Sequence, residues 1–410
     1  MRAVLLHEAA RSYGRTVRTR LEPLLSFAAR SRVPGGFGYL GDDGTVVPDR
    51  PVETWITARM THVFGLAVLS GQPGAGDLAA HGVAALRGGP LHDGEHGGWR
   101  ASTEDDTKAA YVHAFVLLAG ATSTLAGTAG GRELLAEALG VWEQRFWDDD
   151  EGLAAESFDA TWTTSEDYRG ANANMHGVEA MLAAADAVAP TDVGTAARLR
   201  THALRATERI VHGWARERDW RLPEHFTGQW EPLPEFNREH PADPFRPYGV
   251  TVGHQFEWSR LCLHLAAALG EHAPGWLTTD ADRLFLAAVE RGWAADGREG
   301  FPYTLDWADR PVVAARMHWV LCEAVAAASV RYAVTGDPRA ATLQHRWEEL
   351  GDRVFLDPAV GSWHHELTPE GAVGSSTWAG KPDAYHLVQM LLLPGRPVRG
   401  SLAAALLTAP

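Results

Sequence analysis

A repeating unit of two helices and a glycine-containing loop organises almost the whole of this 410-residue chain. Apolar residues recur with helical spacing in about twelve segments, and sustained two-residue alternation is almost absent. Between alternate helices the same signal returns, a glycine followed by aromatic and polar residues. Self-similarity at intervals of roughly 55 to 80 residues is typical of repeat architectures. The chain is therefore expected to be mostly helical and built from one unit used several times.

Six such units can close into an all-α (α/α)6 barrel, with short β-hairpin loops at its mouth. Helices are expected at residues 18–31, 53–70, 76–87, 105–127, 131–147, 172–188, 195–215, 254–270, 279–294, 316–335, 338–355 and 384–393. The loop signal reads GGFGYL at 35–40, GGWRAS at 97–102, EGLAAES at 151–157, WRLPEHF at 220–226, EGFPYTL at 299–305 and GSWHHEL at 361–367. We expect residues 18–410 to form a single barrel domain, preceded by a short N-terminal extension at residues 1–17.

The negative charge of the chain argues against polyanionic partners. Its 37 lysines and arginines face 52 aspartates and glutamates, which gives a formal net charge of −15 at pH 7. Nucleic acids and anionic membranes require a basic patch that replaces their condensed counterions, so neither partner is expected. An anionic small molecule could still be held by local arginines, and the candidates are Arg59, Arg169, Arg246 and Arg316. An uncharged small molecule is the more natural ligand.

Cysteine use and hydropathy indicate a cytoplasmic protein without a membrane segment. Cys262 and Cys322 lie inside apolar helical patterns, which suits buried thiols in a reducing compartment better than a disulfide framework. No apolar stretch approaches the roughly 20 residues that a membrane-spanning helix needs. The sequence leaves the oligomeric state open between a monomer and a homodimer.

The motifs indicate neither a metal site nor a nucleotide cofactor. In the acidic run TEDDTKAAY at 103–111, Thr103 and the carboxylates after it are typical of a capped helix start rather than of a magnesium site. His364 and His365 are adjacent, and neighbouring side chains of a strand point in opposite directions, which disfavours a zinc pair. The sequence contains no Rossmann or P-loop signature.

Unusual polar residues lie near the starts of the six segments that would form the inner ring. In YRGANANMHGVEAML at 168–182, Asn172 and His176 are four residues apart and would share one helix face. One asparagine suffices as a helix cap, a role that suits Asn174. Because all inner helices of such a ring begin at one mouth, these residues should converge there. The six starts carry Arg59, Tyr111, Asn172 with His176, His254 with Glu257, Trp319 with Glu323, and His386.

Four stretches carry a resemblance to a known family. The sequence resembles the N-acylglucosamine 2-epimerase family of sugar epimerases and isomerases in YRGANANMHGVEAMLAA, PYGVTVGHQFEWSRLCLHL, RMHWVLCEAVAAA and KPDAYHLVQMLL, in this order. The resemblance covers roughly residues 20–395. Two further stretches resemble the aldose–ketose isomerase branch of the family most: EHF with GQWEPLPEFN at 224–237, and DPFRPYGVTVGHQFEW at 243–258. This branch includes mannose and sulfoquinovose isomerases.

The resemblance implies a cofactor-free reaction carried by two histidines. Interconversion of an aldose and a 2-ketose moves a proton between neighbouring carbons through a cis-enediol, after the sugar ring has been opened. A histidine suits both tasks because its unperturbed pKa of about 6.5 lets it take and give protons near neutral pH. By resemblance, His386 would transfer the proton between C2 and C1, and His254 would open the ring and move protons among the sugar oxygens. The two roles could be exchanged, and the same pair could serve a 2-epimerase.

Charged residues of the inner helices would support these histidines or the sugar. By resemblance, Arg59 would lie near the sugar carbonyl, although a structural ion pair would equally explain a buried arginine. Glu257, one helical turn after His254, would orient or charge that imidazole. Glu323 would pair with Arg59 or accept hydrogen bonds from sugar hydroxyls.

Neutral side chains would complete the sugar site. Tyr111, Asn172 and His176 offer hydrogen-bond donors and acceptors that match the needs of hydroxyl groups. Trp319 and the loop residue Trp363 could offer flat apolar faces to the C–H side of the sugar. For any tryptophan other than Trp319, a position in the core is the favoured expectation. The long segment 227–249 would narrow the mouth and favour a monosaccharide.

The resulting hypothesis is an isomerase that acts on a free monosaccharide, with D-mannose to D-fructose as the leading reaction. Sulfoquinovose isomerisation and 2-epimerisation of N-acylglucosamine or a disaccharide are the alternatives within the family. The sequence leaves open which sugar is preferred, whether the outcome is isomerisation or epimerisation, which histidine acts at C2, and the physiological direction.

Two further classes of function fit an α/α barrel. An inverting glycoside hydrolase would use Glu257 and Glu323 as its carboxylate pair, but this role would leave the histidines unexplained. A carbohydrate-binding or protein-binding module would bind without turnover, so loss of both histidines would change no reaction. A hydrolase would lose its activity in Glu323→Gln but not in His386→Ala, whereas a binding module would have no turnover to lose.

Overall fold

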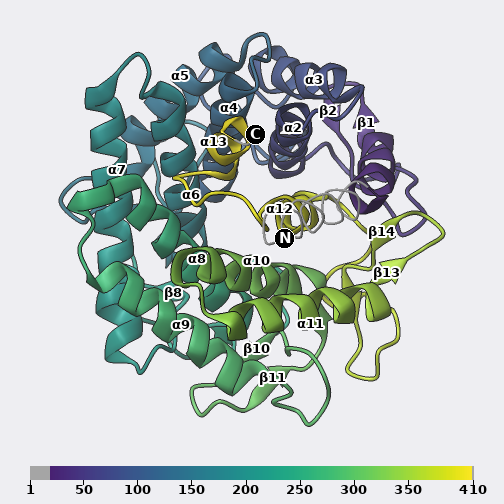
Figure 1. Ribbon diagram of the computed structural model, residues 1–410. Coiled ribbons are helices and arrows are strands. Elements are labelled where there is room, and N and C mark those ends of the chain that lie inside the picture. Colours follow the sequence, from purple (N-terminus) through teal and green to yellow (C-terminus); the bar gives the residue numbers. More distant parts are fainter. Residues whose placement is uncertain (1–18, 409–410) are drawn as a thin grey trace, which may run out of the picture.

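Two concentric rings of helices surround a common axis in the computed structural model, which describes residues 19–408 (Figure 1). The inner ring consists of α2 (Thr54–Leu69), α4 (Ala110–Leu125), α6 (Ala171–Val188), α8 (Val252–Leu269), α10 (His318–Thr335) and α12 (Tyr385–Leu392). Each inner helix contacts the next and α12 returns to α2, so the ring is closed. The (α/α)6 barrel predicted from the sequence is confirmed.

The outer ring supplies one helix between each two neighbouring inner helices. It consists of a helical segment over residues 19–28 and of α3 (Ala75–Gly88), α5 (Gly131–Val141), α7 (Val193–Thr207), α9 (Trp276–Gly292) and α11 (Pro338–Val354). Short helical turns extend the ring at η1 (Ala29–Ser31), η2 (Trp142–Phe146), η3 (Glu208–Ala215) and η4 (Gly270–His272). The extension predicted for residues 1–17 lies outside the described residues.

The position of each helix follows from the distribution of its apolar residues. In α2, 14 of 16 residues are buried, because this helix is enclosed between the axis and the outer ring. In α3, only 6 of 14 residues are buried, and the rest of the helix faces solvent. A helix that is apolar all round belongs inside, whereas an amphipathic helix covers a surface. Likewise, most residues of the inner helix α10 are buried, whereas only a few residues of the outer helix α11 are.

Short antiparallel strands connect the rings at one end of the barrel. Four inner helices start from strands that pair with a returning loop: β3 (Lys108–Ala109) with β6 (Ser157–Phe158), β7 (Arg169–Gly170) with β8 (His225–Phe226), β9 (Val250–Thr251) with β10 (Thr304–Leu305), and β12 (Arg316–Met317) with β15 (Glu366–Leu367). The remaining strands are β1 (Arg32–Val33), β2 (Gly36–Phe37), β4 (Trp147–Asp148), β5 (Leu153–Ala154), β11 (Pro311–Val313), β13 (Leu356–Asp357) and β14 (Ser362–Trp363). Four other pairs are hairpins, β1 with β2, β4 with β5, β10 with β11 and β13 with β14, and each lies at one of the predicted glycine-containing repeats. The repeat at 97–102 forms only isolated bridges.

The returning loops also anchor the starts of five inner helices. In each case the first helical residue donates its backbone N–H to a loop carbonyl: Thr54 to Ala101 (3.0 Å), Ala110 to Glu156 (2.7 Å), Ala171 to Glu224 (2.9 Å), Val252 to Tyr303 (3.4 Å) and His318 to His365 (3.0 Å). This contact satisfies one of the N–H groups that a helix leaves free at its start. It also places the five acceptor residues at equivalent positions around the mouth.

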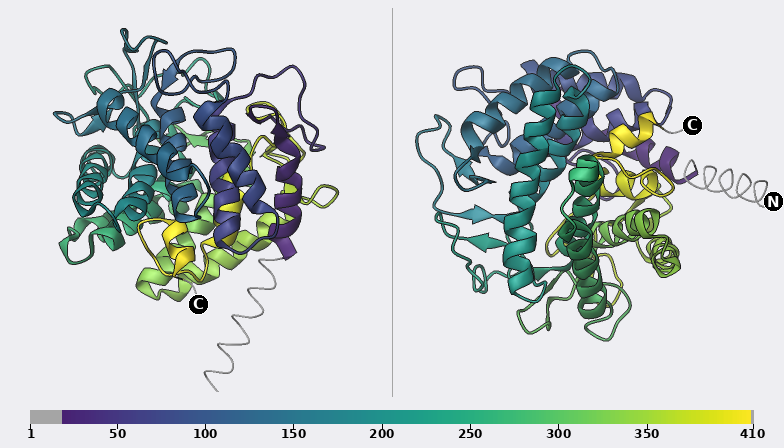
Figure 2. Two further views of the ribbon diagram at one scale, coloured as in Figure 1. Left: turned by 90° about the horizontal axis from the view of Figure 1, so that it is seen from above. Right: turned by 60° about the vertical axis from the view of Figure 1, so that its left-hand side comes forward.

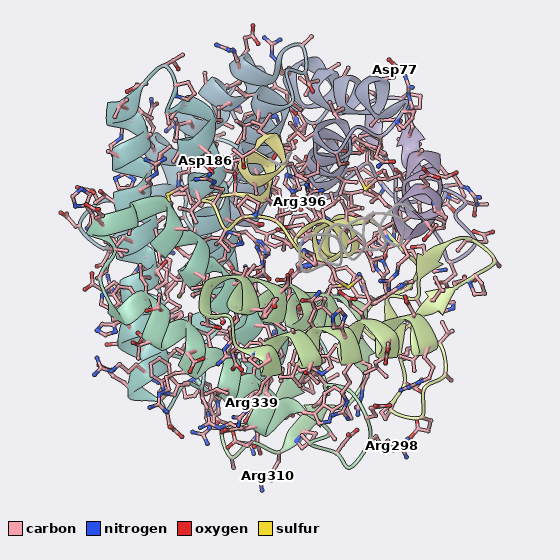
Figure 3. All side chains as sticks on the ribbon, viewed as in Figure 1. Asp77, Asp186, Arg298, Arg310, Arg339 and Arg396 are labelled. Atoms are coloured by element: carbon pink, nitrogen blue, oxygen red, sulfur yellow. The ribbon has the colours of Figure 1, made fainter. Side chains whose placement is uncertain are left out.

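The two ends of the barrel differ in structure. The hairpin loops gather at one end, and α13 (Leu402–Leu407) packs against α2, α4 and α6 at the other (Figure 2). The sequence analysis missed α13, a short helix capped by Ser401, whose hydroxyl accepts the N–H of Ala404 at 3.2 Å. Charged side chains such as Asp77, Arg298 and Arg310 are exposed on the outer rim (Figure 3). Among residues 19–408, no helix has the length and apolar character needed to cross a membrane.

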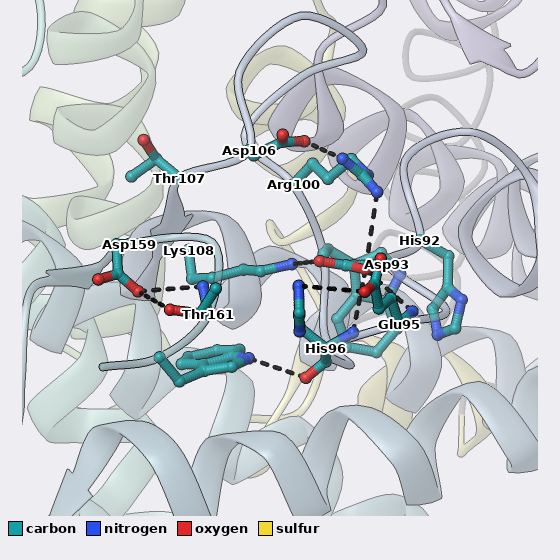
Figure 4. A network of polar contacts seen from close by, with 12 residues as sticks. His92, Asp93, Glu95, His96, Arg100, Asp106, Thr107, Lys108, Asp159 and Thr161 are labelled. Atoms are coloured by element: carbon teal, nitrogen blue, oxygen red, sulfur yellow. Dashed lines mark hydrogen bonds and ion pairs between the residues drawn. The ribbon is translucent and has the colours of Figure 1, made fainter. Parts of the chain in front are cut away.

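The start of α4 differs from the expected helix at 105–127. A fully buried ion pair joins Lys108 to Asp93 at 2.6 Å, and Asp93 also accepts the N–H groups of Glu95 and His96 (Figure 4). This pair and the pairing of β3 with β6 hold residues 108–109 extended, so the helix begins at Ala110. The prediction that Thr103 and the following carboxylates cap this helix is therefore wrong.

Candidate active site

A cavity of about 580 Å³ opens at the mouth of the barrel, where the six inner helices begin. Eight of the nine site residues predicted from the sequence line it: Arg59, Tyr111, Asn172, His176, His254, Glu257, Trp319 and His386. The sequence analysis did not predict the other lining residues: Pro244, Phe245, Tyr303, His318, His365, Trp378, Pro382 and Asp383. The ninth predicted residue, Glu323, lies behind the cavity wall.

His386 stands in the first turn of α12 and is held by a carboxylate from α10. Its Nδ1 donates to Oε1 of Glu323 at 2.9 Å, and Oε2 of Glu323 accepts from Nε of Arg260 at 3.1 Å. Because Nδ1 is engaged, Nε2 is the ring nitrogen that remains for a ligand. Burial lowers the pKa of His386 well below its ordinary value, and the nearby guanidinium of Arg59 adds to this effect. His386 is therefore a neutral base at neutral pH.

His254 has an equivalent carboxylate partner that the sequence analysis did not identify. Its Nδ1 donates to Oε1 of Glu224 at 2.9 Å, and both side chains are less than a tenth exposed. The expectation that Glu257 orients this imidazole is wrong, because Glu224 from the returning loop holds the ring nitrogen instead. A Cβ on Gly253 would lie 2.2 Å from the ring of Trp319, so only glycine allows this close approach.

Trp319 lies against both histidines. Its ring centroid is 5.2 Å from that of His254 and 5.6 Å from that of His386, with the rings tilted by 38° and 33°. Both imidazoles therefore lie next to the ring of Trp319 in the wall of the cavity. A sugar packed against these residues would be close to both histidines.

We expect Glu224→Gln to lower kcat by about 100-fold while KM changes only a few-fold, because the loss affects the proton chemistry of His254 more than sugar binding. Steady-state kinetics of the purified variant would measure both constants. Glu231→Gln, an exposed change in the same loop, is the control and should leave kcat unaltered. An unchanged kcat in Glu224→Gln would exclude a role of this carboxylate in the reaction.

Arg59 forms an ion pair and also lines the cavity. Its guanidinium donates to Oδ2 of Asp383 at 3.2 Å and to the hydroxyl of Tyr111 at 2.7 Å. Asp383 in turn accepts the backbone N–H of Tyr385 at 2.8 Å, which fixes the start of α12. The predicted alternative pairing of Arg59 with Glu323 is wrong, since Glu323 bonds to His386 and Arg260.

The polar start of α6 divides into a ligand-facing pair and a structural residue. Asn172 and His176 line the cavity, and Oδ1 of Asn172 and Nδ1 of His176 are buried without a hydrogen-bond partner among the described residues. Burial lowers the pKa of His176 to about 4, so its ring is neutral at neutral pH. Asn174 instead bonds to both backbone groups of Ala154 and to the carbonyl of Gly170, which supports the hairpin. The predicted role of Asn174 as the cap of α6 is wrong, because this residue lies inside the helix and no side chain caps its start.

Other predicted contributors lie away from the cavity. Arg169 bonds to backbone carbonyls, Arg246 pairs with Glu166, and Arg316 pairs with Asp296. Trp363 stacks on Phe355 in the core at 5.7 Å, the position favoured for tryptophans other than Trp319, and it does not contact the sugar site. Trp378 takes the place of a loop aromatic in the cavity wall.

The segment 227–249 narrows the mouth through Phe245. This ring meets Trp55, Tyr111 and Trp378 edge-on at 5.3–6.0 Å. It separates the cavity from a neighbouring hollow of about 1020 Å³, with which the cavity shares Tyr111, Asn172 and Phe245. The neighbouring hollow is larger, but neither His254 nor His386 lines it. The smaller cavity is therefore the candidate active site.

Buried carboxylates beneath the cavity have spacings that could suit a metal ion. Ligand atoms of Glu257, Glu323 and His386 lie within 4.8 Å of one another, and His176, Glu179 and Glu257 form a second such group. The guanidinium of Arg260 stands among these groups, 3.1–3.8 Å from each of the three carboxylates. It already supplies positive charge at the place where a metal ion would have to sit.

Comparison with known proteins identifies the family of the chain. A model of the N-acylglucosamine 2-epimerase (GlcNAc 2-epimerase) family matches residues 35–390. The chain belongs to this family. One similar protein is a D-mannose isomerase of Thermobifida fusca, which is 51% identical to this chain over 393 residues. The match covers 94% of this chain and 95% of the relative. A D-mannose isomerase of Pseudomonas cannabina pv. alisalensis is 45% identical over 390 residues, or 93% and 92% of the two chains.

A solved structure of this N-acylglucosamine 2-epimerase family gives the same fold. A crystal structure of D-mannose isomerase superposes with a TM-score of 0.82 at 26% identity, and the match covers 92% of this chain and 96% of that one. The family assignment made from sequence stretches is therefore confirmed.

Proposed function

We propose that this protein is an isomerase that interconverts D-mannose and D-fructose. Two relatives at 51% and 45% identity, each matched over more than nine tenths of its length, are D-mannose isomerases and support this assignment. The observation that carries the mechanism is a pair of buried histidines, each with a carboxylate on Nδ1 and each next to Trp319. Such a pair can move protons on a sugar without a cofactor.

Ring opening is assigned to His254. Closed mannose must gain a proton on its ring oxygen and lose the proton of its anomeric hydroxyl before C2 becomes acidic. His254 can accept the hydroxyl proton at Nε2 and return it to the ring oxygen, because Nδ1 is fixed by Glu224. Glu224 stabilises the imidazolium that forms between these two steps. Open-chain aldose is the product.

Proton transfer between carbons is assigned to His386. Its neutral Nε2 takes the proton from C2, the C2–H electrons form the C1–C2 double bond of the cis-enediol, and the C1 carbonyl oxygen gains negative charge. The proton of the O2 hydroxyl then moves to the O1 oxyanion, a transfer that is assigned to His254. Delivery of the proton on His386 to C1, as the O2 oxyanion collapses to the C2 carbonyl, gives fructose. Glu323 accepts from Nδ1 throughout and stabilises the protonated ring. Arg59, paired with Asp383 and Tyr111, contributes positive charge on the same cavity wall.

The charges of the cavity favour a neutral sugar over a sulfonated one. A sulfonate needs a dedicated cationic pocket. Arg59 is the single arginine among the residues that line the cavity, and Asp383 already pairs with it at 3.2 Å. Arg169, Arg246 and Arg316 have other partners. Sulfoquinovose is therefore the weaker candidate substrate.

Glu257 and Glu323 do not form the carboxylate pair that a glycoside hydrolase would need. An inverting glycosidase needs two carboxyl groups on opposite sides of the glycosidic bond, about 6.5–9.5 Å apart. Glu257 lines the cavity, but Glu323 lies behind it and bonds to His386 and Arg260. A carboxylate in that position orients a base rather than contacting a glycoside.

We place the protein in the cytoplasm because both of its cysteines are reduced and buried. Cys262 and Cys322 are free thiols inside α8 and α10. Such thiols are typical of a reducing compartment.

The substrate assignment is tested by a competition assay. Chelator-treated enzyme is incubated with equimolar D-mannose, D-glucose and sulfoquinovose, and the products are followed by NMR. We expect fructose to form from mannose at least about tenfold faster than any product forms from the other sugars, since the cavity offers no free cation to a sulfonate. Faster turnover of sulfoquinovose would overturn the mannose assignment and leave the family assignment intact.

A further inference from the structure

Three buried carboxylates beneath the cavity share one guanidinium. Arg260 of α8 lies 3.1 Å from Glu323 of α10, 3.6 Å from Glu257 of α8 and 3.8 Å from Glu179 of α6. All four side chains are less than a tenth exposed. The next cation, Arg59 of α2, is already paired with Asp383. Three ionised carboxylates would therefore leave uncompensated negative charge in the protein interior, which is strongly unfavourable.

Two of these carboxylates have hydrogen-bond donors. Glu323 accepts from Nδ1 of His386 and from Nε of Arg260. Glu179 accepts from the hydroxyl of Tyr385 on α12. Donors of this kind stabilise a carboxylate in its ionised form. Both residues can hold negative charge beside Arg260.

Glu257 lacks such donors. Its two oxygens are buried and have no hydrogen-bond partner among the described residues, although the side chain lines the cavity. The nearest polar groups are Arg260 at 3.6 Å and Nδ1 of His176 on α6 at 3.7 Å. Burial, together with the charges of Glu323 and Glu179, raises the pKa of Glu257 well above its ordinary value. Burial also raises the pKa of Glu323, but of the three carboxyl groups only Glu257 lacks a hydrogen-bond donor among the described residues.

We propose that Glu257 is a neutral carboxylic acid in the resting enzyme and donates its O–H to an oxygen of the bound sugar. This role rests on the proposed isomerase function. When His386 takes the C2 proton, negative charge develops on the oxygens of the enediolate, and a neutral acid stabilises that charge. An ionised carboxylate in the same place would repel it. A carboxylic acid kept neutral by its surroundings can serve as such a donor in an enolising enzyme.

Infrared spectroscopy of the ligand-free protein tests the protonation state directly. At neutral pH we expect the wild-type spectrum to contain the carbonyl stretch of a buried carboxylic acid. We expect this band to be absent from the spectrum of Glu257→Gln. The same band should persist in Glu323→Gln and in Glu156→Gln; the second variant is needed because burial raises the pKa of Glu156 to about 7. A band that is unchanged in Glu257→Gln, or absent from the wild type, would overturn the proposal.

Kinetics test the role of the proton. Glutamine is neutral and keeps a donor, so Glu257→Gln should retain kcat within about tenfold of the wild type, whereas Glu257→Ala should lose about 100-fold. Equal losses in the two variants would show that an ionised carboxylate is required. Denaturant midpoints of both variants identify any loss that comes from unfolding. Because the infrared result needs no substrate, it stands or fails separately from the mannose assignment.

Discussion

Replacement of His386 by alanine is expected to lower kcat/KM for mannose isomerisation by about 10³-fold. A positioned general base contributes about 10²–10⁴-fold, and here one imidazole serves both proton transfers between C2 and C1. The loss should appear in kcat, because hydrogen bonds to the sugar come mainly from other inner helices. Steady-state assays of fructose formation would measure it. His264→Gln is a matched control, since His264 is equally buried on α8 and does not line the cavity.

The pH dependence of the wild type follows from the same residue. His386 acts as a base only when its imidazole is unprotonated, and burial lowers its pKa well below the ordinary 6.5. Activity should therefore stay on its plateau as the pH falls through 6.5 and decline only at lower pH. An acid limb of kcat centred at or above this ordinary value would contradict the assignment, as would a His386→Ala variant that keeps more than a tenth of wild-type activity.

Arg260→Met is expected to lower the free energy of unfolding by about 3–5 kcal/mol, the usual cost of leaving buried charges without their partner. The change removes the guanidinium from Glu179, Glu257 and Glu323, and methionine roughly preserves its volume. Chemical denaturation would measure the difference. Kinetic activity should fall as well, because Glu323 would lose the contact that positions it beneath His386.

The stability loss in Arg260→Met should depend on pH. Without the cation, the folded-state pKa of Glu179 loses a contribution that lowers it, and the pKa of Glu323, which burial already raises, rises further. A group with a raised folded pKa favours the folded state below its unfolded pKa, so the deficit should shrink as the pH falls toward about 4.3 and grow above it. Arg310→Met is the control, because that ion pair with Asp306 is exposed and should cost at most about 1 kcal/mol. Equal effects of the two variants would refute the role of Arg260.

The helical repeat explains why most of the site could be predicted from one sequence. Inner helices of a closed ring begin at one mouth, so side chains in their first turns converge even when they are far apart in the chain. Arg59 and His386 are separated by more than 300 residues, yet both line one cavity. The spacing of Asn172 and His176 gave their shared face correctly.

Hydrogen-bond partners that loops supply to the inner helices were not predicted. Glu224 ends the stretch WRLPE, and Glu156, Tyr303 and His365 end the equivalent stretches of other repeats. Alignment of the repeats would have shown that this position meets the start of an inner helix, which is the signal that was missed. Pairing within one helix favoured Glu257 as the partner of His254, but the loop carboxylate is closer. Trp363 was a possible sugar contact because it lies in a loop of the mouth, but tertiary packing places it on Phe355 in the core.

The most direct test of the central claim follows hydrogen at two carbons of the sugar. Chelator-treated enzyme is incubated with D-mannose in D₂O, and fructose is examined by NMR for deuterium at C1. A histidine-bound proton that exchanges with solvent before its return should leave deuterium at C1 of fructose, and His386→Ala should abolish both the product and the label. Mannose that stays unchanged, or deuterium that enters only C2 of an aldose, would contradict the account.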